Sequence, residues 1–242
     1  STTVVIEDVT LEFDASGTLI NAVQNGESVD LSAVSISKEN GTLTLTDSSF
    51  ADGKLTIDYT YTLNTSSQKH TNPDGENNAS TKDVSESFAV TVNGVAQESG
   101  ITATIVDDIV GLESVTVNTP EGVINDNAEK LTGRLEGLNT SEDGTTITVQ
   151  VTGKDGESLG TFSAEQDENG EWNFTSDTDN GSSFVLNEDD SFTYTRPTAD
   201  IQNPEADSYT FAVTVKDGDG DTVSQTSEVV ATSTMTTESS AT

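Results

Sequence analysis

Apolar and polar residues alternate along most of the chain. In residues 54–63 every second residue is apolar, and residues 208–215 repeat this pattern. A period of two is typical of β-strands that bury one face. The segments that we predict as strands are 2–13, 29–36, 41–46, 54–63, 88–92, 101–106, 112–117, 130–138, 145–152, 158–164, 171–175, 191–195, 208–215 and 222–231.

Asp-Gly and Asn-Gly pairs separate many of these segments, and such pairs are characteristic of tight turns between strands. Short strands at this spacing indicate an all-β sandwich or barrel. We expect no helix beyond a single turn at 127–131.

The chain is expected to hold two β domains in tandem. The pentapeptide Phe-Ala-Val-Thr-Val occurs at 88–92 and again at 211–215, which suggests two domains of similar plan. We place the boundary at Asp107-Asp108, so that residues 1–108 and 109–231 form the domains and 232–242 a Ser/Thr-rich linker or tail. The long polar loop 64–82 exceeds a usual connector.

Composition narrows the function. Only 31% of the residues are hydrophobic, which fits thin cores, and 9 basic against 43 acidic residues give a net charge of −34. Phosphates would be repelled, so we expect no nucleic-acid partner and no anionic membrane surface. The chain has no cysteine, and no apolar run approaches the roughly 20 residues of a bilayer span. Because it begins at Ser1 without a visible signal peptide, we expect a piece of a longer protein.

Three carboxylates alternate with glycines in one loop, and they point to a cation. Asp217, Asp219 and Asp221 follow the predicted strand 208–215. Glycine allows the backbone to fold back so that oxygens converge, and Ca²⁺ takes six to eight oxygen ligands. A solvated hairpin loop is the alternative. A surface adapted to salty surroundings would also explain the acidity.

The loop imitates an EF-hand only in part. The three aspartates match the first, third and fifth positions, and Glu228 falls at the twelfth. The sixth position requires glycine but holds Thr222, and the flanking segments alternate like strands. We therefore reject an EF-hand and keep the prediction of a calcium site in a loop between strands.

The stretch Phe-Ala-Val-Thr-Val-Lys-Asp-Gly-Asp-Gly-Asp-Thr, together with a strand that ends Ile-Val-Asp-Asp, resembles the extender repeats of bacterial repeats-in-toxin (RTX) adhesins. Residues 187–195 are similar to a strand of their cadherin-like modules, and 122–129 and 169–174 to parts of their immunoglobulin-like modules. The resemblance covers most of residues 40–230. It implies two tandem immunoglobulin-like or cadherin-like β-sandwiches. Some members of that family carry a split domain that hosts ligand-binding inserts, and residues 1–108, with their long loop 64–82, are the candidate for it.

The resemblance also implies a function. The chain would be a non-catalytic, calcium-stabilised spacer of a large adhesin, type I secreted to the bacterial cell surface, and would act in cell adhesion and biofilm formation. It would be a monomer whose partners are neighbouring domains of the same chain. The residues expected to bind Ca²⁺ are Asp107, Asp108, Asp217, Asp219, Asp221, Asn125, Asp126 and Glu129.

Other functions stay open. One domain can bind a glycan or peptide directly, through loop 64–82. A catalytic role is disfavoured, because His70 is the only histidine and has no triad partners at a telling spacing. The carboxylates do not exclude a glycosidase by residue type, but aromatic residues for a sugar cleft are few. We expect Trp172 and Phe174 to pack in a core.

Overall fold

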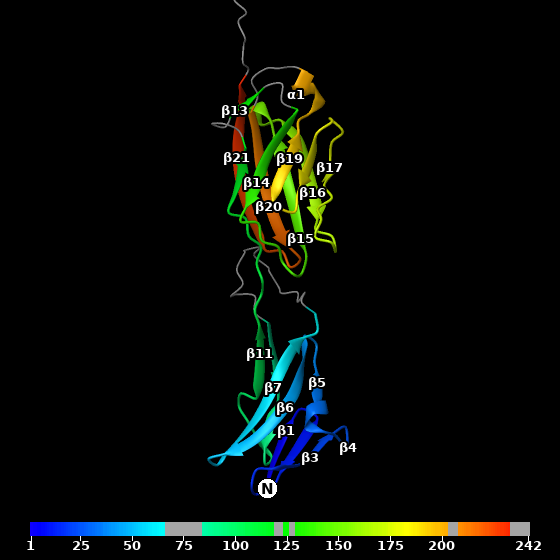
Figure 1. Cartoon of the computed structure of the whole chain (residues 1–242), viewed down its shortest axis with the longest axis vertical. Coiled ribbons are helices and arrows are strands. Elements are labelled where there is room, and N and C mark those ends of the chain that lie inside the picture. Colours follow the sequence, from blue (N-terminus) through cyan, green and yellow to red (C-terminus); the bar gives the residue numbers. More distant parts are fainter. Residues whose placement is uncertain (66–83, 119–122, 126–128, 203–207, 233–242) are drawn as a thin grey trace, which may run out of the picture. The chain divides into compact units, whose positions relative to one another are not determined.

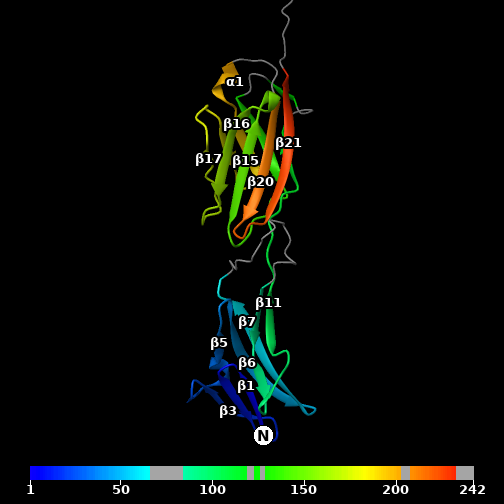
Figure 2. The same cartoon turned by 180° about the vertical axis from the view of Figure 1, so that it is seen from behind.

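Most of the described chain is β-strand (Figures 1 and 2). The computed structural model describes residues 1–65, 84–118, 123–125, 129–202 and 208–232, and at 123–125 and 230–232 it describes the backbone alone. These residues form two compact units, of which the first ends at Asp107 and the second begins at Asp108. The predicted all-β fold class is confirmed.

The described residues of the first unit contain eleven strands in three sheets. They are β1 (Thr2–Ile6), β2 (Val9–Phe13), β3 (Leu19–Gln24), β4 (Glu27–Ser28), β5 (Ser35–Ser37), β6 (Gly41–Ala51), β7 (Lys54–Leu63), β8 (Val84–Phe88), β9 (Val90–Val92), β10 (Val95–Ala96) and β11 (Ile101–Ile105). The sheet orders are β10-β9-β1-β2-β3-β4, β5-β6-β7 and β11-β8. Side chains from all three sheets meet in one core that includes Leu11, Leu45 and Phe88.

The second unit has two sheets around a larger core. Its strands are β12 (Ser114–Val117), β13 (Val123–Asn125), β14 (Lys130–Glu136), β15 (Thr145–Thr152), β16 (Ser158–Glu165), β17 (Thr175–Ser176), β18 (Ser183–Leu186), β19 (Ser191–Thr195), β20 (Ser208–Asp217) and β21 (Thr222–Thr232). The orders are β12-β14-β19-β18 and β13-β21-β20-β15-β16-β17. Figure 1 shows β14 and β19 in front, and Figure 2, from behind, shows β15, β16, β20 and β21.

Helices are few and short. In the part of the chain that the structure describes, two 3₁₀ turns lie at Leu31–Ala33 and Lys154–Gly156, and one α-helix, α1, spans Thr198–Gln202. The sequence pattern missed α1. It presents Asp200, whose Oδ2 accepts a hydrogen bond from the Tyr209 hydroxyl at 2.7 Å, and that hydroxyl accepts one from Nε of the buried Arg196 at 2.8 Å. A network of side-chain hydrogen bonds between α1 and its neighbours therefore fixes this turn.

Three predicted strands differ from the structure. Residues 2–13 form the hairpin of β1 and β2, with Glu7 at a φ of 54° in the turn. The parity of the buried positions changes there, from 4 and 6 to 9, 11 and 13, and this change marks the turn. Residues 29–36 contain the 3₁₀ turn at Leu31–Ala33 in place of a continuous strand, and residues 171–174 are not in a strand.

The repeated pentapeptide adopts two different backbone arrangements. Residues 211–215 lie inside the single long strand β20, whereas 88–92 are interrupted at Ala89, where the chain leaves the β8–β11 sheet for the β1 sheet. Ala89 is held there by Glu7, which accepts the Ala89 N–H with Oε1 at 2.7 Å and donates its own N–H to the Ala89 carbonyl at 3.0 Å. The same five residues therefore adopt different backbone conformations, because their tertiary neighbours differ.

Both phenylalanines of this pentapeptide are fully buried, Phe88 in the first core and Phe211 in the second. We expect each change to alanine to cost about 3–5 kcal/mol, in its own unit, because it leaves a cavity. Amide hydrogen exchange, resolved by residue, measures both effects. Val185→Ala is the control, since Val185 is 50% exposed, and should cost less than about 0.5 kcal/mol. Equal loss of protection in both units from either variant would contradict this.

Candidate metal centre

The loop between β20 and β21 is organised by one oxygen of Asp217. Its Oδ1 accepts hydrogen bonds from the backbone N–H of Gly220 at 2.9 Å and of Asp221 at 2.7 Å. The Asp217 N–H donates to the Asp221 carbonyl at 3.0 Å, and Gly220 takes a φ of 107° that suits glycine. The second oxygen of Asp217, Oδ2, takes no part in these hydrogen bonds.

The loop between β14 and β15 lies against this hairpin. Gly218 donates its N–H to Oδ1 of Asp143 at 3.2 Å. A Cβ at Gly218 would stand 2.1 Å from the carbonyl oxygen of Asp143, so only glycine permits this approach. The Ser141 N–H donates to the hydroxyl of Thr145 at 2.8 Å, which fixes the start of the loop.

Asp108 ties the incoming segment, residues 107–110, to the same loop. Its Oδ1 accepts the Ser141 hydroxyl at 2.8 Å and its Oδ2 accepts the Glu142 N–H at 2.8 Å. Val110 is buried in the core of the second unit. Asp107 precedes Asp108 directly, so the anchored Asp108 also holds it at this end of the unit.

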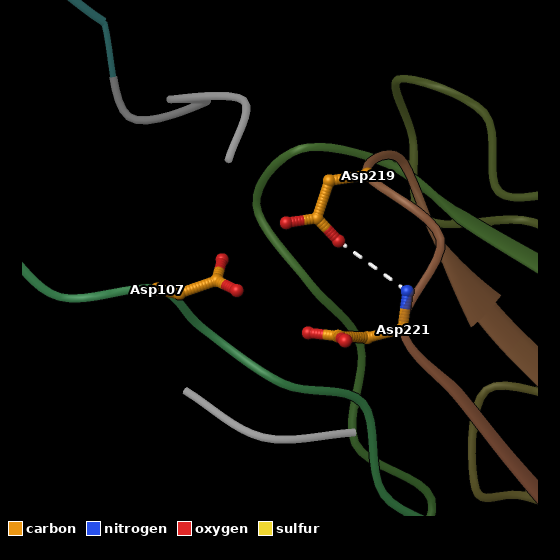
Figure 3. Close-up of side chains that lie close together, drawn as sticks. All are labelled: Asp107, Asp219 and Asp221. Carbon is orange, nitrogen blue, oxygen red and sulfur yellow. Dashed lines mark hydrogen bonds between the residues drawn. The ribbon is translucent and has the colours of Figure 1, made fainter. Parts of the chain in front are cut away.

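These contacts gather six carboxylates into two groups of three. Asp107, Asp219 and Asp221 form one group, and their side chains face a common space in Figure 3. The other consists of Asp108, Asp143 and Asp217. Within each group, one oxygen of every carboxylate lies within 4.8 Å of the others. We call these the 107 trio and the 108 trio.

Burial makes this arrangement costly. Asp107, Asp217 and Asp221 are only 3%, 5% and 0% exposed. Within the described chain, Oδ2 of Asp217 and Oδ2 of Asp219 are buried without a hydrogen-bond donor, and so is Oδ2 of Asp143. Buried carboxylate oxygens usually have donors, so these atoms lack the partner that their burial requires.

The electrostatics agree with this. Burial raises the pKa of Asp217 to about 7, and hydrogen bonding to Asp219 together with the negative charges of Asp219 and Asp143 contributes. The hydrogen bond from the backbone N–H of Asp221 lowers the pKa of Asp217 but does not compensate. Without a cation, the cluster therefore retains a proton that an exposed aspartate would lose.

The donor set fits a hard divalent cation. All six side chains offer oxygen, on three segments fixed by hydrogen bonds, and Ca²⁺ prefers such ligands in flexible geometry. Three carboxylates supply part of a coordination shell of six to eight, and bidentate binding, carbonyls or water would supply the rest. Softer metals would favour nitrogen or sulfur, which neither trio offers.

The structure brings together five of the eight predicted ligands: Asp107, Asp108, Asp217, Asp219 and Asp221. Asn125 lies in β13, which pairs with the end of β21 at Thr232, ten residues from the Thr222 end beside the trios. Glu129 is exposed and belongs to neither trio, and its carbonyl accepts the Arg196 N–H. Asp126 lies outside the described residues.

Sequence reasoning missed Asp143. It occurs in Glu142-Asp143-Gly144, which reads as an ordinary turn between strands. The register reveals it, because β15 pairs with β20 so that Thr145 lies opposite Asp217. A carboxylate two residues before Thr145 then comes beside the β20–β21 loop. The rejection of an EF-hand is confirmed, since strands β20 and β21 flank the loop and Glu228 is exposed on β21.

The other residues singled out in the sequence are not part of this centre. Most of loop 64–82, with His70, lies outside the described residues. Trp172 and Phe174 pack against the core of the second unit, as predicted, and the ring of Phe174 lies 4.9 Å from that of Phe184. No described helix is long and apolar enough to cross a membrane.

Comparisons with known proteins give little. No protein-family model and no curated protein matches the chain. Among solved structures, it is similar to a chain from work on the host cell surface retention of a 1.5-MDa bacterial ice-binding adhesin. The identity is 17% and the TM-score 0.29, over 96% of this chain and 87% of that one.

The raised pKa of Asp217 gives a prediction for the calcium-free protein. Unfolded, this carboxyl ionises near 3.8, so between about pH 4 and pH 7 the folded state binds more protons, and the free energy of unfolding falls as pH rises. Asp217→Asn keeps the Oδ1 acceptor and removes the charge. We therefore expect the variant to melt above the wild type at pH above 7, with the difference vanishing towards pH 4.

Thermal melts in excess chelator measure this. Asp47→Asn, at an exposed carboxylate, removes the same charge and should show no such crossover. In saturating calcium the order should reverse, because Asp217→Asn then lacks a ligand. A variant less stable than the wild type at every pH in chelator would show that Asp217 carries no such electrostatic cost.

Proposed function

We propose that the chain is a non-catalytic, calcium-braced β module of a bacterial surface adhesin. The observation that carries the proposal is the pair of carboxylate trios, in which buried side-chain oxygens of Asp143, Asp217 and Asp219 lack hydrogen-bond donors. The motifs at 105–108 and 211–222, which resemble RTX adhesin repeats, support the adhesin assignment. A spacer of this kind needs stiffness, and the geometry offers a means to supply it.

The incoming segment is the part that calcium would stiffen. Asp107 and Asp108 are consecutive, yet they belong to different trios. Calcium in both trios would thus hold one peptide unit from two sides, against the 141–143 loop and the 217–221 hairpin. This would remove rotational freedom from the segment through which the chain enters the second unit, and would offset the repulsion among the carboxylates.

Calcium suits these sites better than magnesium. Mg²⁺ requires near-ideal octahedral geometry and releases its water reluctantly, whereas Ca²⁺ tolerates irregular shells of carboxylates and carbonyls. The donors here come from two loops and an extended segment. We propose an extracellular location for the same reason, since millimolar calcium there would fill sites of modest affinity. With no cysteine in the chain, calcium would take the bracing role of disulfides.

We expect calcium to stabilise the second unit strongly. A ligand present at 100 times its Kd adds about 2.7 kcal/mol. For a unit of this size, that corresponds to a rise of about 10 °C in melting temperature. Scanning calorimetry, with calcium and then with excess chelator, measures the shift. Measurements in high monovalent salt separate specific binding from screening, because salt weakens only the latter.

Matched variants locate the effect. Asp143→Asn should lower calcium affinity by about tenfold or more in calorimetric titrations, because it removes one charge from the 108 trio. Asp155→Asn changes the same charge in the exposed turn Lys154–Gly156 and should leave affinity unchanged. If calcium raises the melting temperature no further than an equal ionic strength of sodium chloride, the acidity is an adaptation to salt and the proposal fails.

A further inference from the structure

The first unit carries an apolar groove beside the edge of a sheet. Its floor is formed by Val4 and Ile6 of β1 and Val90 of β9, and one wall by Ile57 and Tyr59 of β7. The opposite wall consists of residues 97–101, from β10 to the start of β11. The cavity measures about 430 Å³. All of these residues belong to the first unit, so the groove is independent of the carboxylate trios.

The wall opposite β7 is fixed by close backbone packing. Gln97 donates its N–H to the Val90 carbonyl at 2.8 Å. Gly100 takes a φ of 50°, and a Cβ there would stand 2.4 Å from the Phe88 carbonyl oxygen. A side chain at position 100 would therefore move this wall. The groove is consequently built into the fold.

Strand β7 is the edge of its sheet at this groove. Among the described residues it pairs with β6 and with no second strand, although it is ten residues long. Its inward-facing Tyr59 is 47% exposed, while its cross-strand partner Leu45 is fully buried. A long edge with free backbone groups and a half-exposed inward aromatic is suited to accept another strand.

We propose that this groove accepts an extended, basic segment of a partner protein, which adds to β7 as a further strand. Its backbone would bond to the edge of β7, and every second side chain, apolar, would lie over Val4, Ile6 and Val90. The alternate side chains would face the outer surface of the β6–β7 hairpin. There Asp58 lies opposite Asp47, and Glu98 stands at the far rim of the groove.

Charge selects this occupant. Asp47 and Asp58 form a like-charge pair across β6 and β7, and an added strand with Lys or Arg beside Asp58 would relieve it. Lys54, at the hairpin turn, is the nearest base along β7. A second copy of this chain would place Asp58 against another β7 with the same charge, at −34 per chain. A neutral glycan would leave the apolar floor and the strand edge without matching partners.

The test uses a fluorescent heptapeptide with alternating Lys and Val, blocked at both ends, at physiological ionic strength and in saturating calcium. We expect saturable binding by anisotropy, with NMR shifts at Ile57, Tyr59 and Val90. Tyr59→Ser should weaken it about tenfold and Asp58→Lys about threefold. Both positions are exposed, so spectra can verify that each variant is folded.

Three controls decide the result. Val185→Ser alters a half-exposed valine on β18, an edge strand of the second unit, and should not change binding. A heptapeptide with Glu in place of Lys, and one with a central Pro, should bind at least tenfold more weakly. Equal binding of the Pro peptide, shifts confined to other surfaces, or unchanged affinity in Tyr59→Ser would each overturn the proposal, since attraction of a cation to an acidic chain would then suffice.

Discussion

Repulsion among buried carboxylates is the constraint on which the end of the second unit depends. At an effective dielectric constant near 20, two charges 4.8 Å apart repel by about 3 kcal/mol, so one fully ionised trio costs about 10 kcal/mol. This is comparable to the whole stability of an ordinary domain, about 5–15 kcal/mol. Ionising all members of a trio together is therefore costly without a cation, and in the 108 trio the raised pKa of Asp217 shows the same conflict relieved by a proton.

The backbone concentrates this conflict. The hydrogen bonds from Gly218 to Asp143 and from Ser141 and Glu142 to Asp108 hold three separate segments at fixed distances. These neutral contacts position the acids but leave Oδ2 of Asp143 and of Asp217 without donors. The loops are thus preorganised for a cation, which the side chains and backbone of the loops do not themselves supply. Preorganisation of this kind lowers the cost of binding, because little further ordering is needed.

The sequence identified most of the acidic residues of the candidate site, but it did not show which loops come together there. The alternation of apolar and polar residues predicted β structure. The alternation of Asp217, Asp219 and Asp221 with glycines identified these three residues as candidate ligands. Asp143 could not be found in this way, because a turn of Glu-Asp-Gly has the same local pattern whether it faces water or another loop. Its role depends on the pairing of β15 with β20, a long-range property. The interrupted pentapeptide at 88–92 makes the same point, since Glu7 holds Ala89 out of the strand.

The negative charge that requires a cation at one end also governs the edge strand β7. A long edge beside an apolar groove invites pairing with another copy, which leads to aggregation. Asp58, opposite Asp47, opposes this, because two such edges would bring like charges together without the burial that could order a cation between them. The same residue favours a strand of opposite charge. A single aspartate on the outer face can therefore exclude self-association and select a basic partner, since both effects follow from the sign of the charge placed beside it.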